Sequence, residues 1–225
     1  GEFYQVVEEN LEKEQKMFIV TANPETFMRA NKDPEIAKMI LDPQTTITPD
    51  GIGVVAGAKL IGKEIQETIT GVDLAKKLME SAHEKKKSIY LFGASKEVSQ
   101  KMEEMLKEKY PNAILAGRQD GYVEDKQKVF LEIAKVNPDI VLVALGAPTQ
   151  EMLIYQNLEH FTKGIFVGVG GSFDVLSGSK KRAPNFFVKM RLEWLYRITT
   201  EPKRLKRFAK YNITYGFKIL KYKAL

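Results

Sequence analysis

Cysteine is absent from all 225 residues, so this chain has no disulfide and no cysteine-ligated metal. Its absence is typical of proteins from a reducing compartment. Long apolar runs are absent too: no stretch of about 18 residues is hydrophobic enough to span a membrane, and no secretory signal peptide is visible. Because the sequence begins with Gly1 and not with methionine, we expect the natural chain to begin upstream.

Several motifs of catalysis and nucleotide binding are missing. Only two histidines occur, His83 and His160, and both lie among charged residues, which predicts surface positions. No Ser-His-Asp set, His/Glu metal spacing, Asp-x-Asp motif or Walker loop is present. The glycines at 168–171 do not form a dinucleotide fingerprint, because Phe173 stands where the third glycine belongs. A nucleotide diphosphate would therefore have to be neutralised by arginines rather than by a metal.

Acidic residues are scarce at one end of the chain. Residues 180–225 contain fourteen basic and two acidic side chains, a net charge of +12, so the remainder carries −6 of the total of +6. A basic tail on an acidic body indicates an anionic partner such as a membrane, a nucleic acid or a phosphorylated substrate. The alternative is a solvated charged helix.

What the sequence does contain is a repeated order of apolar run, glycine and helix. It occurs at residues 88–95, 140–148 and 164–172. Continuous apolar strands that alternate with helices predict an α/β fold, a Rossmann-like and mostly parallel sheet with helices on both faces. We expect this catalytic domain to cover residues 1–199 and a basic helical appendage to cover 200–225.

Further elements are expected around these repeats. Short strands are predicted at 18–20 and 45–47, and Asn23 followed by Pro24 predicts a helix start. The stretch that begins at Gly51 fits either a helix or an extended segment. Helices are also predicted at 71–86, 96–109 and 124–136, and a further strand at 113–115.

Candidate binding residues follow the predicted strands. Because the carboxyl ends of parallel strands meet at one edge of a sheet, we expect them to share one face. Gly168, Gly170 and Gly171, followed by Ser172, would bring backbone N–H groups close to a diphosphate. The alternative is that these glycines only form a tight turn.

Polar side chains at the same edge are candidates for chemistry. Asp50 lies in a turn after a strand, and Asp174 follows the glycine loop, so either is a candidate general base or a helix cap. Gln150 at a helix start suits a sugar hydroxyl or a uracil edge, or it caps the helix. Residues 21–23 also end a predicted strand and include Thr21 and Asn23.

The C-terminal segment supplies the cations. Arg197, Arg204 and Arg207 are spaced by seven and three residues, so one helical face could carry all three. Between Arg204 and Tyr222, apolar residues alternate with lysines, which is typical of a helix at an anionic lipid surface. We expect Leu205, Phe208 and the tyrosines to lie in that interface. The alternative is a helix docked on the protein.

Nine short stretches carry a resemblance to a known family: 21–24 (TANP), 49–54 (PDGIGV), 70–73 (TGVD), 91–94 (LFGA), 121–122 (GY), 145–151 (LGAPTQE), 168–174 (GVGGSFD), 181–184 (KRAP) and 192–197 (LEWLYR). Taken in order, they resemble the WecG/TagA/CpsF family of glycosyltransferases over nearly the whole chain. The resemblance implies inverting transfer of N-acetylmannosamine, or a related sugar, from a UDP-sugar donor to undecaprenyl-diphosphate-linked GlcNAc. It implies that such transfers serve teichoic acid or surface polysaccharide synthesis.

The resemblance also implies roles for residues. Asp50 would be the catalytic base, Thr21, Asn23 and Gln150 would line the site, and the three arginines would belong to an appendage that closes over it at the membrane. Thr68 departs from the family pattern, because relatives often have arginine in that stretch. Relatives also have a further N-terminal strand region that this sequence lacks.

The expected partners are therefore the UDP-sugar, the polyprenyl-diphosphate-linked acceptor and the anionic cytoplasmic face of a bacterial membrane. Neither a cofactor, a metal nor nucleic acid is expected, and the sequence leaves homo-oligomer formation open. The first rival interpretation is a nucleotide-binding enzyme of another class, such as an NAD-dependent oxidoreductase. The second is a nucleic-acid-binding module that uses the basic tail.

Overall fold

The computed structural model describes residues 1–190, 193–200 and 203–223. Its strands are β1 (Lys16–Ala22), β2 (Thr45–Pro49), β3 (Ser88–Gly93), β4 (Ile114–Gln119), β5 (Ile140–Ala144) and β6 (Gly164–Gly168). Its helices are α1 (Glu2–Glu12), α2 (Pro24–Ala30), α3 (Pro34–Leu41), α4 (Ile52–Leu60), α5 (Gly71–Lys85), α6 (Lys96–Lys109), α7 (Lys126–Val136), α8 (Thr149–Asn157), the 3-10 turn η1 (Leu158–His160), α9 (Ser172–Leu176), α10 (Asn185–Lys189), α11 (Glu193–Thr200) and α12 (Lys203–Lys223).

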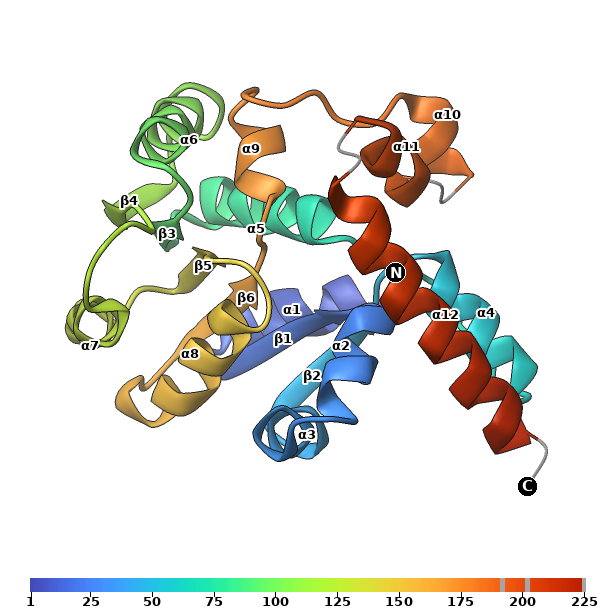
Figure 1. The fold of residues 1–225 in the computed structure, drawn as a ribbon. Helices are drawn as coiled ribbons and strands as arrows, with labels where there is room; N and C mark the ends of the chain where they lie inside the picture. The colour runs from blue at the N-terminus through green and yellow to red at the C-terminus, as the bar shows by residue number, and fades with distance from the viewer. Residues whose placement is uncertain (191–192, 201–202, 224–225) are drawn as a thin grey trace. The chain divides into compact units, whose positions relative to one another are not determined.

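The six strands form one parallel sheet in the order β2-β1-β6-β5-β3-β4 (Figure 1). The predicted α/β class is confirmed, and the sheet is wholly rather than mostly parallel. The two central strands β5 and β6 are buried at every position. Helices α5, α6 and α9 gather on one face of these strands, and α7 and α8 pack together on the other (Figure 1). Apolar runs without alternation result from this double coverage.

Aromatic rings fill the face beneath α7. The rings of Phe92 and Phe130 have centroids 6.4 Å apart, Phe130 and Phe161 5.6 Å, and Phe161 and Phe166 4.6 Å. The last two pairs are edge-on, a geometry that adds roughly 0.5–1.5 kcal/mol per pair beyond the burial of area. This chain of rings fixes α7 and η1 against β3 and β6.

The chain forms two compact units. Unit 1 consists of residues 1–20, 42–46 and 71–180, and unit 2 consists of residues 21–41, 47–70 and 181–225. The polypeptide passes from one to the other inside β1, after Leu41 and inside β2, and again after Thr70 and Lys180. Residues 200–225 lie within unit 2, and their predicted role as a membrane-associating appendage stays a prediction.

Helix α1 of unit 1 is an element that the sequence pattern did not predict. Val7 and Leu11 are its buried residues. Its acidic face meets polar residues of α5: Glu8 accepts a short hydrogen bond from the Ser81 hydroxyl and forms an ion pair with Lys85 at 3.2 Å. Contacts with α5, about seventy residues away in the sequence, therefore stabilise α1, which has only a narrow apolar stripe.

Asp139 ties together the amino-terminal ends of the three central strands of unit 1. Its carboxylate accepts the Ser88 N–H at 2.8 Å and hydroxyl at 2.6 Å, just where β3 begins, and contacts Lys163 Nζ at 2.8 Å before β6. Burial alone would raise the pKa of Asp139, but the hydrogen bonds from Lys163 and Ser88 outweigh it and hold the pKa below its ordinary value.

We expect Asp139→Asn to lower the free energy of unfolding at pH 7 by about 1–3 kcal/mol, because it leaves partly buried donors without a charged acceptor. Because the pKa of Asp139 is lower in the folded state, its ionised carboxylate contributes its full stabilisation above the unfolded-state pKa of about 3.9. This stabilisation is lost as the pH falls through the folded-state pKa. Urea unfolding of both proteins between pH 7 and 3 should show a difference that narrows below about pH 4. The exposed Glu132→Gln is the control, and a difference that does not change with pH would contradict the assignment.

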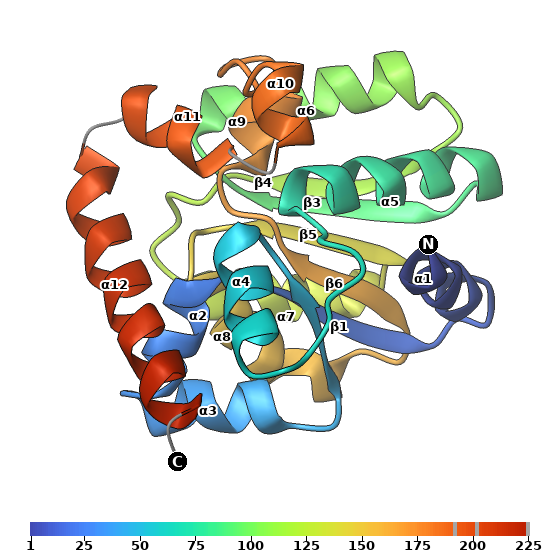
Figure 2. The same cartoon turned by 90° about the vertical axis from the view of Figure 1, so that its right-hand side faces the viewer.

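Unit 2 is organised around α12, which packs along α2 and α4 (Figure 2). The ring of Tyr215, only 8% exposed, stacks on Phe27 of α2 at 6.1 Å. The Arg29 guanidinium lies 5.3 Å from the centre of the Tyr211 ring. The alternative of a docked helix is thus confirmed for this face of α12, and the expectation that its tyrosines lie in lipid is wrong for Tyr215.

Glycine permits the approach of α12 to α4. A β-carbon at Gly57 would overlap the Tyr215 ring, whereas one at Gly216 in α12 would meet nothing within 4 Å. Both glycines lie inside helices, where alanine has the higher intrinsic propensity. The stretch after Gly51, which the sequence left open between helix and extended chain, is α4.

The two Gly→Ala substitutions should therefore have opposite effects. Gly57→Ala is expected to destabilise unit 2 by about 1–3 kcal/mol through overpacking against a pinned ring. Gly216→Ala is expected to stabilise it by roughly 0.5–1 kcal/mol. Thermal unfolding and the rate of proteolysis within α12 measure both changes, and the same sign for the two variants would contradict the packing described.

The opposite face of α12 is apolar and open. Leu205, Ile213, Phe217 and Leu220 are each more than half exposed, and Lys206, Lys210 and Lys221 are exposed beside them. We call these seven residues the outer face of α12. Across the described ranges, none of the helices combines the length and the apolar character that crossing a bilayer requires.

Candidate functional site

The strand order places a switch point inside unit 1. Strands β3 and β5 are neighbours in the sheet. The connection after β3 leads to β4 on one side of this pair, and the connection after β5 leads to β6 on the other side. Open parallel sheets bind ligands at the carboxyl ends of such strands. Here Ala94 N–H donates to Ala144 O at 2.8 Å, and Gly121 N–H donates to Ala94 O at 2.8 Å. The turns after β3, β4 and β5 are thus joined.

Gln150 joins the turns that follow β5 and β6. It is 4% exposed, and its Oε1 accepts the N–H groups of Gly146 and Gly170, both at 3.0 Å. Its Nε2 donates to Glu151 Oε1 at 2.7 Å. Gln150 therefore holds the loops after β5 and β6 together, a role that the sequence did not suggest, and its predicted contact with the substrate stays a prediction. We call Gly146, Gln150, Glu151, Gly168 and Gly170 the glycine cluster.

Gly168 makes room for this side-chain pair. A β-carbon there would lie 2.7 Å from Gln150 Nε2 and 2.8 Å from Glu151 Oε1. Because real β-carbons do not approach other atoms within 3.0 Å, a side chain at position 168 would force the Gln150–Glu151 pair to move. Gly170 has φ +47°, the left-handed region that favours glycine.

Two of the N–H groups predicted to bind a diphosphate already donate hydrogen bonds within the protein. Gly170 N–H donates to Gln150, and Ser172 N–H donates to Val169 O at 3.0 Å. Ser172 is buried, and Gly171 precedes the short helix α9. A diphosphate at this loop would have to use groups other than those two amides.

Unit 2 brings together Thr21, Asn23 and Asp50 at the ends of β1 and β2. The Asp50 N–H donates to Ala22 O at 2.8 Å, so the two chain segments lie side by side here. Asp50 is half-buried in the turn before α4, and Gly51 after it has φ +84°. The predicted turn position of Asp50 is confirmed.

Asn23 caps α2 as its sequence context predicted. Its Oδ1 accepts the Thr26 N–H at 3.2 Å, and the Thr26 hydroxyl accepts the Asn23 N–H at 3.2 Å, which completes a reciprocal capping box. The cap fixes the start of α2 beside Asp50. Thr21 is half-buried, one residue before the end of β1.

Arg207 is tied to the first turn of α2. Its Nε donates to Glu25 Oε2 at 2.7 Å, while the other Glu25 oxygen contacts Arg29 at 2.8 Å. The Glu25 side chain is 15% exposed and that of Arg207 60%. The bond uses one of the five N–H donors of the guanidinium, so Arg207 is oriented near Asn23 while remaining accessible. We call Thr21, Asn23, Glu25, Asp50 and Arg207 the Asp50 corner.

The remaining predicted residues are not in either group. Helix α11 contains Arg197 and α12 contains Arg204, but both side chains lie outside the described residues. Asp174 contacts Lys180 Nζ at 3.9 Å, and its carbonyl accepts the Lys180 N–H. Among the described side chains, no three His, Asp or Glu groups gather as metal ligands would, and metal-independent transfer stays a prediction.

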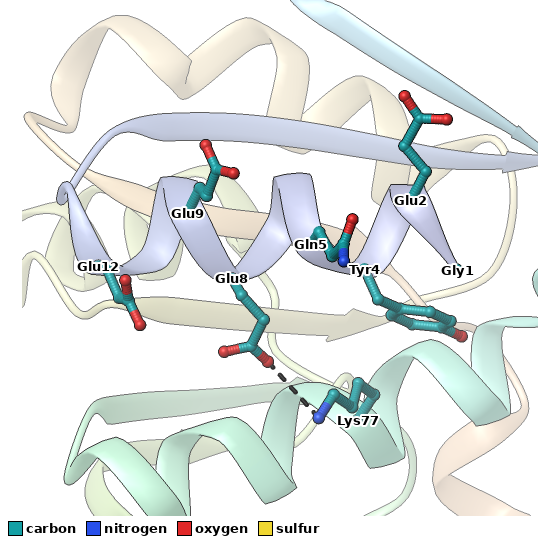
Figure 3. A pocket seen from close by; sticks show the side chains of 8 residues that line it. All are labelled: Gly1, Glu2, Tyr4, Gln5, Glu8, Glu9, Glu12 and Lys77. Carbon is teal, nitrogen blue, oxygen red and sulfur yellow. Dashed lines mark ion pairs between the residues drawn. The ribbon is translucent and has the colours of Figure 1, made fainter.

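A shallow groove of about 710 Å³ lies elsewhere in unit 1, along α1 and α5 (Figure 3). Glutamates dominate its lining, and Glu8 and Lys77 form an ion pair across it at 3.7 Å. Its excess of negative charge would repel a diphosphate. None of the residues predicted for the site lines it, and we assign it no ligand.

Two residues of these groups escaped prediction. Glu151 belongs to the motif 145–151 (LGAPTQE), but its burial beside Gln150 was not predicted. The only sequence feature related to this burial is Gly168, seventeen positions later, whose lack of a side chain leaves room for the pair. Glu25 shows only the Glu25–Arg29 spacing of an ordinary helical ion pair. Its second partner, Arg207, is 182 positions away.

The fold places the predicted polar residues near the carboxyl edge of a parallel sheet, where α/β proteins commonly bind their ligands. Comparison with known proteins gives the class of chemistry. The family model "Glycosyl transferase WecG/TagA/CpsF family" matches residues 1–225, so the chain belongs to this family of glycosyltransferases.

Curated relatives agree with this assignment. A Bacillus spizizenii protein is 45% identical over 197 residues, which are 88% of this chain and 76% of that protein. A Bacillus subtilis protein is 43% identical over 199 residues (87% and 77%), and one from Staphylococcus aureus MRSA252 is 34% identical over 208 residues (92% and 81%). All three are named N-acetylglucosaminyldiphosphoundecaprenol N-acetyl-beta-D-mannosaminyltransferase. The alternative of an NAD-dependent oxidoreductase is not favoured.

Proposed function

We propose that this enzyme transfers N-acetylmannosamine from a UDP-sugar, with inversion, to GlcNAc-diphosphoundecaprenol in teichoic acid or surface polysaccharide synthesis. The observation that carries the proposal is the 45% identity over 197 residues to a transferase named for that sugar and that acceptor. The resemblance of 49–54 (PDGIGV) to the family supplies the candidate base.

In the proposed reaction, Asp50 accepts the proton of the acceptor hydroxyl. The hydroxyl oxygen forms a bond to the anomeric carbon from the face opposite the diphosphate, and the bond from that carbon to UDP breaks. UDP leaves with the electron pair, and the sugar inverts its anomeric configuration. The capped start of α2 and the bond from Asp50 N–H to Ala22 hold the base in place, which is the positioning that such catalysis needs.

Arginine would neutralise the leaving UDP in place of a metal. Arg207 is oriented by Glu25 and remains 60% exposed, and guanidinium groups pair strongly with phosphate oxygens. We therefore expect transfer to continue at an unchanged rate in EDTA. Initial rates with and without added magnesium or manganese measure this, and activity lost in EDTA and restored by either ion would contradict it.

We further propose that the outer face of α12 holds the enzyme on an anionic membrane surface. Four apolar side chains more than half exposed there, with lysines interleaved, match the pattern of an interfacial helix. Basic residues near an anionic surface contribute about 1 kcal/mol each. Such attachment would place the enzyme where a polyprenyl-linked acceptor is found.

The experiment that tests the function is UDP release from a panel of UDP-sugars with a short-chain GlcNAc-diphospholipid acceptor. We expect release only with UDP-N-acetylmannosamine and only when the acceptor is present. The anomeric proton of the product, observed by NMR, should show the configuration opposite to that of the donor. Release with another donor alone would reassign the sugar, and retained configuration would exclude direct displacement.

A further inference from the structure

Glu151 is a buried carboxylate for which the proposed chemistry has no direct use. It lies in the first turn of α8 and is 8% exposed. Its Oε1 accepts from Gln150 Nε2 at 2.7 Å. Burying a carboxylate costs free energy that hydrogen bonds or an opposite charge must offset, so the partners of Glu151 indicate its role.

The hydrogen bonds around Gln150 fix the orientation of its carboxamide. Two backbone N–H groups, from Gly146 and Gly170, point at one terminal atom, which must therefore be the oxygen. The NH₂ group then needs an acceptor, and the Glu151 carboxylate provides it. A flipped carboxamide would set NH₂ against two N–H donors and present an oxygen to a carboxylate.

Glycine at 168 preserves space for this arrangement. A side chain there would displace the Gln150 Nε2 and Glu151 Oε1 atoms that form the bond. Three separate features, the carboxylate, the carboxamide and the missing side chain, thus support one geometry at the carboxyl ends of β5 and β6.

We propose that Glu151 is a positioning residue for transfer: it sets the orientation of the Gln150 carboxamide, which in turn fixes the loops after β5 and β6. Glu151 acts through Gln150 and does not touch the substrate. The proposal rests on the proposed function only for its activity readout, because loop order is measurable without any substrate.

The first experiment compares Glu151→Leu and Glu151→Gln in the full chain by amide hydrogen exchange in NMR. Leucine has a similar size and no acceptor, so exchange at Gly146 and Gly170 should accelerate about ten- to hundredfold, the effect of one unsatisfied buried donor. Glutamine keeps an acceptor oxygen and should restore most of the protection. Exchange at Leu142 in β5 should not change in either variant.

The matched control is Glu104→Leu in α6. Glu104 accepts from Gln100 Nε2 at 3.1 Å, the same type of bond on an exposed surface. Water replaces an exposed partner, so neither exchange nor activity should change. If Glu151→Leu fails to fold, Gly168→Ala tests the same geometry, and it should speed exchange at the same two glycines without removing a charge.

Activity provides the second readout. Transfer by Glu151→Leu should fall about ten- to hundredfold and recover in Glu151→Gln. The proposal is overturned if Gly146 and Gly170 exchange within about twofold of wild type in Glu151→Leu, or if glutamine is as impaired as leucine. Wild-type protein that transfers no N-acetylmannosamine would instead refute the proposed function, and the exchange data would still decide the role of Glu151.

Discussion

Asp50→Asn is expected to reduce transfer by about two to four orders of magnitude, because asparagine cannot accept the proton of the attacking hydroxyl. The carboxamide has nearly the same shape, and the backbone bond from residue 50 to Ala22 O does not involve the side chain. The protein should therefore fold normally. Initial rates with the donor and soluble acceptor, at saturating concentrations of both, measure the change in kcat.

Asp33→Asn is the matched control for this variant. Asp33 also precedes a helix of unit 2, where its Oδ1 accepts the Glu35 N–H at 3.0 Å. Asparagine caps helices as well as aspartate does, so this variant should retain wild-type rates. Near-normal turnover of a folded Asp50→Asn protein would remove Asp50 from the role of base.

Arg207→Met should lower transfer to a soluble acceptor about ten- to hundredfold, the loss expected when one charge-assisted bond to a diphosphate disappears. Its ion pair with Glu25 is largely exposed on the arginine side, so folding should be little affected. Lys206→Met changes the neighbouring residue on the outer face of α12. It should leave soluble transfer unchanged and weaken binding to phosphatidylglycerol vesicles about fivefold.

The two neighbours therefore separate catalysis from membrane attachment. Vesicle sedimentation at several salt concentrations and transfer to the soluble acceptor are measured for both proteins. If Arg207→Met transfers sugar normally to the soluble acceptor, Arg207 belongs only to the surface charge of α12. If Lys206→Met impairs soluble transfer as strongly as Arg207→Met, the division of α12 into two faces is incorrect.

The sequence predicted those elements whose signals are local. The continuous apolar runs of β5 and β6, the helix cap at Asn23 and the turn at Asp50 depend on neighbours within a few residues, and the structure confirms them. In such cases the physical cause of the structure is present in the segment itself. The closeness of Thr21, Asn23 and Asp50 follows from the parallel sheet, because the carboxyl ends of neighbouring strands meet at one edge.

Features created by distant partners were not predictable. Helix α1 has a narrow apolar stripe and is completed by α5. Helix α4 is rich in small residues, and its assignment depends on Tyr215 packing over Gly57. Gln150 was assigned a ligand-binding or helix-capping role because nothing local shows that its oxygen meets Gly170, twenty positions later. Each of these structures is decided by a contact that one segment alone cannot reveal.

The discontinuity of unit 2 has a consequence for biosynthesis. Its first two segments, 21–41 and 47–70, are translated before unit 1 is complete, but α12, the helix against which α2 and α4 pack, is translated after it. Unit 1 is complete in sequence at residue 180, and the next 45 residues take about 2–9 s to synthesise at typical bacterial and eukaryotic rates. The segment that contains Asp50 therefore remains without its packing partner until α12 is synthesised, so a chain that stops before α12 would contain the proposed base but lack the helix that packs on α2 and α4.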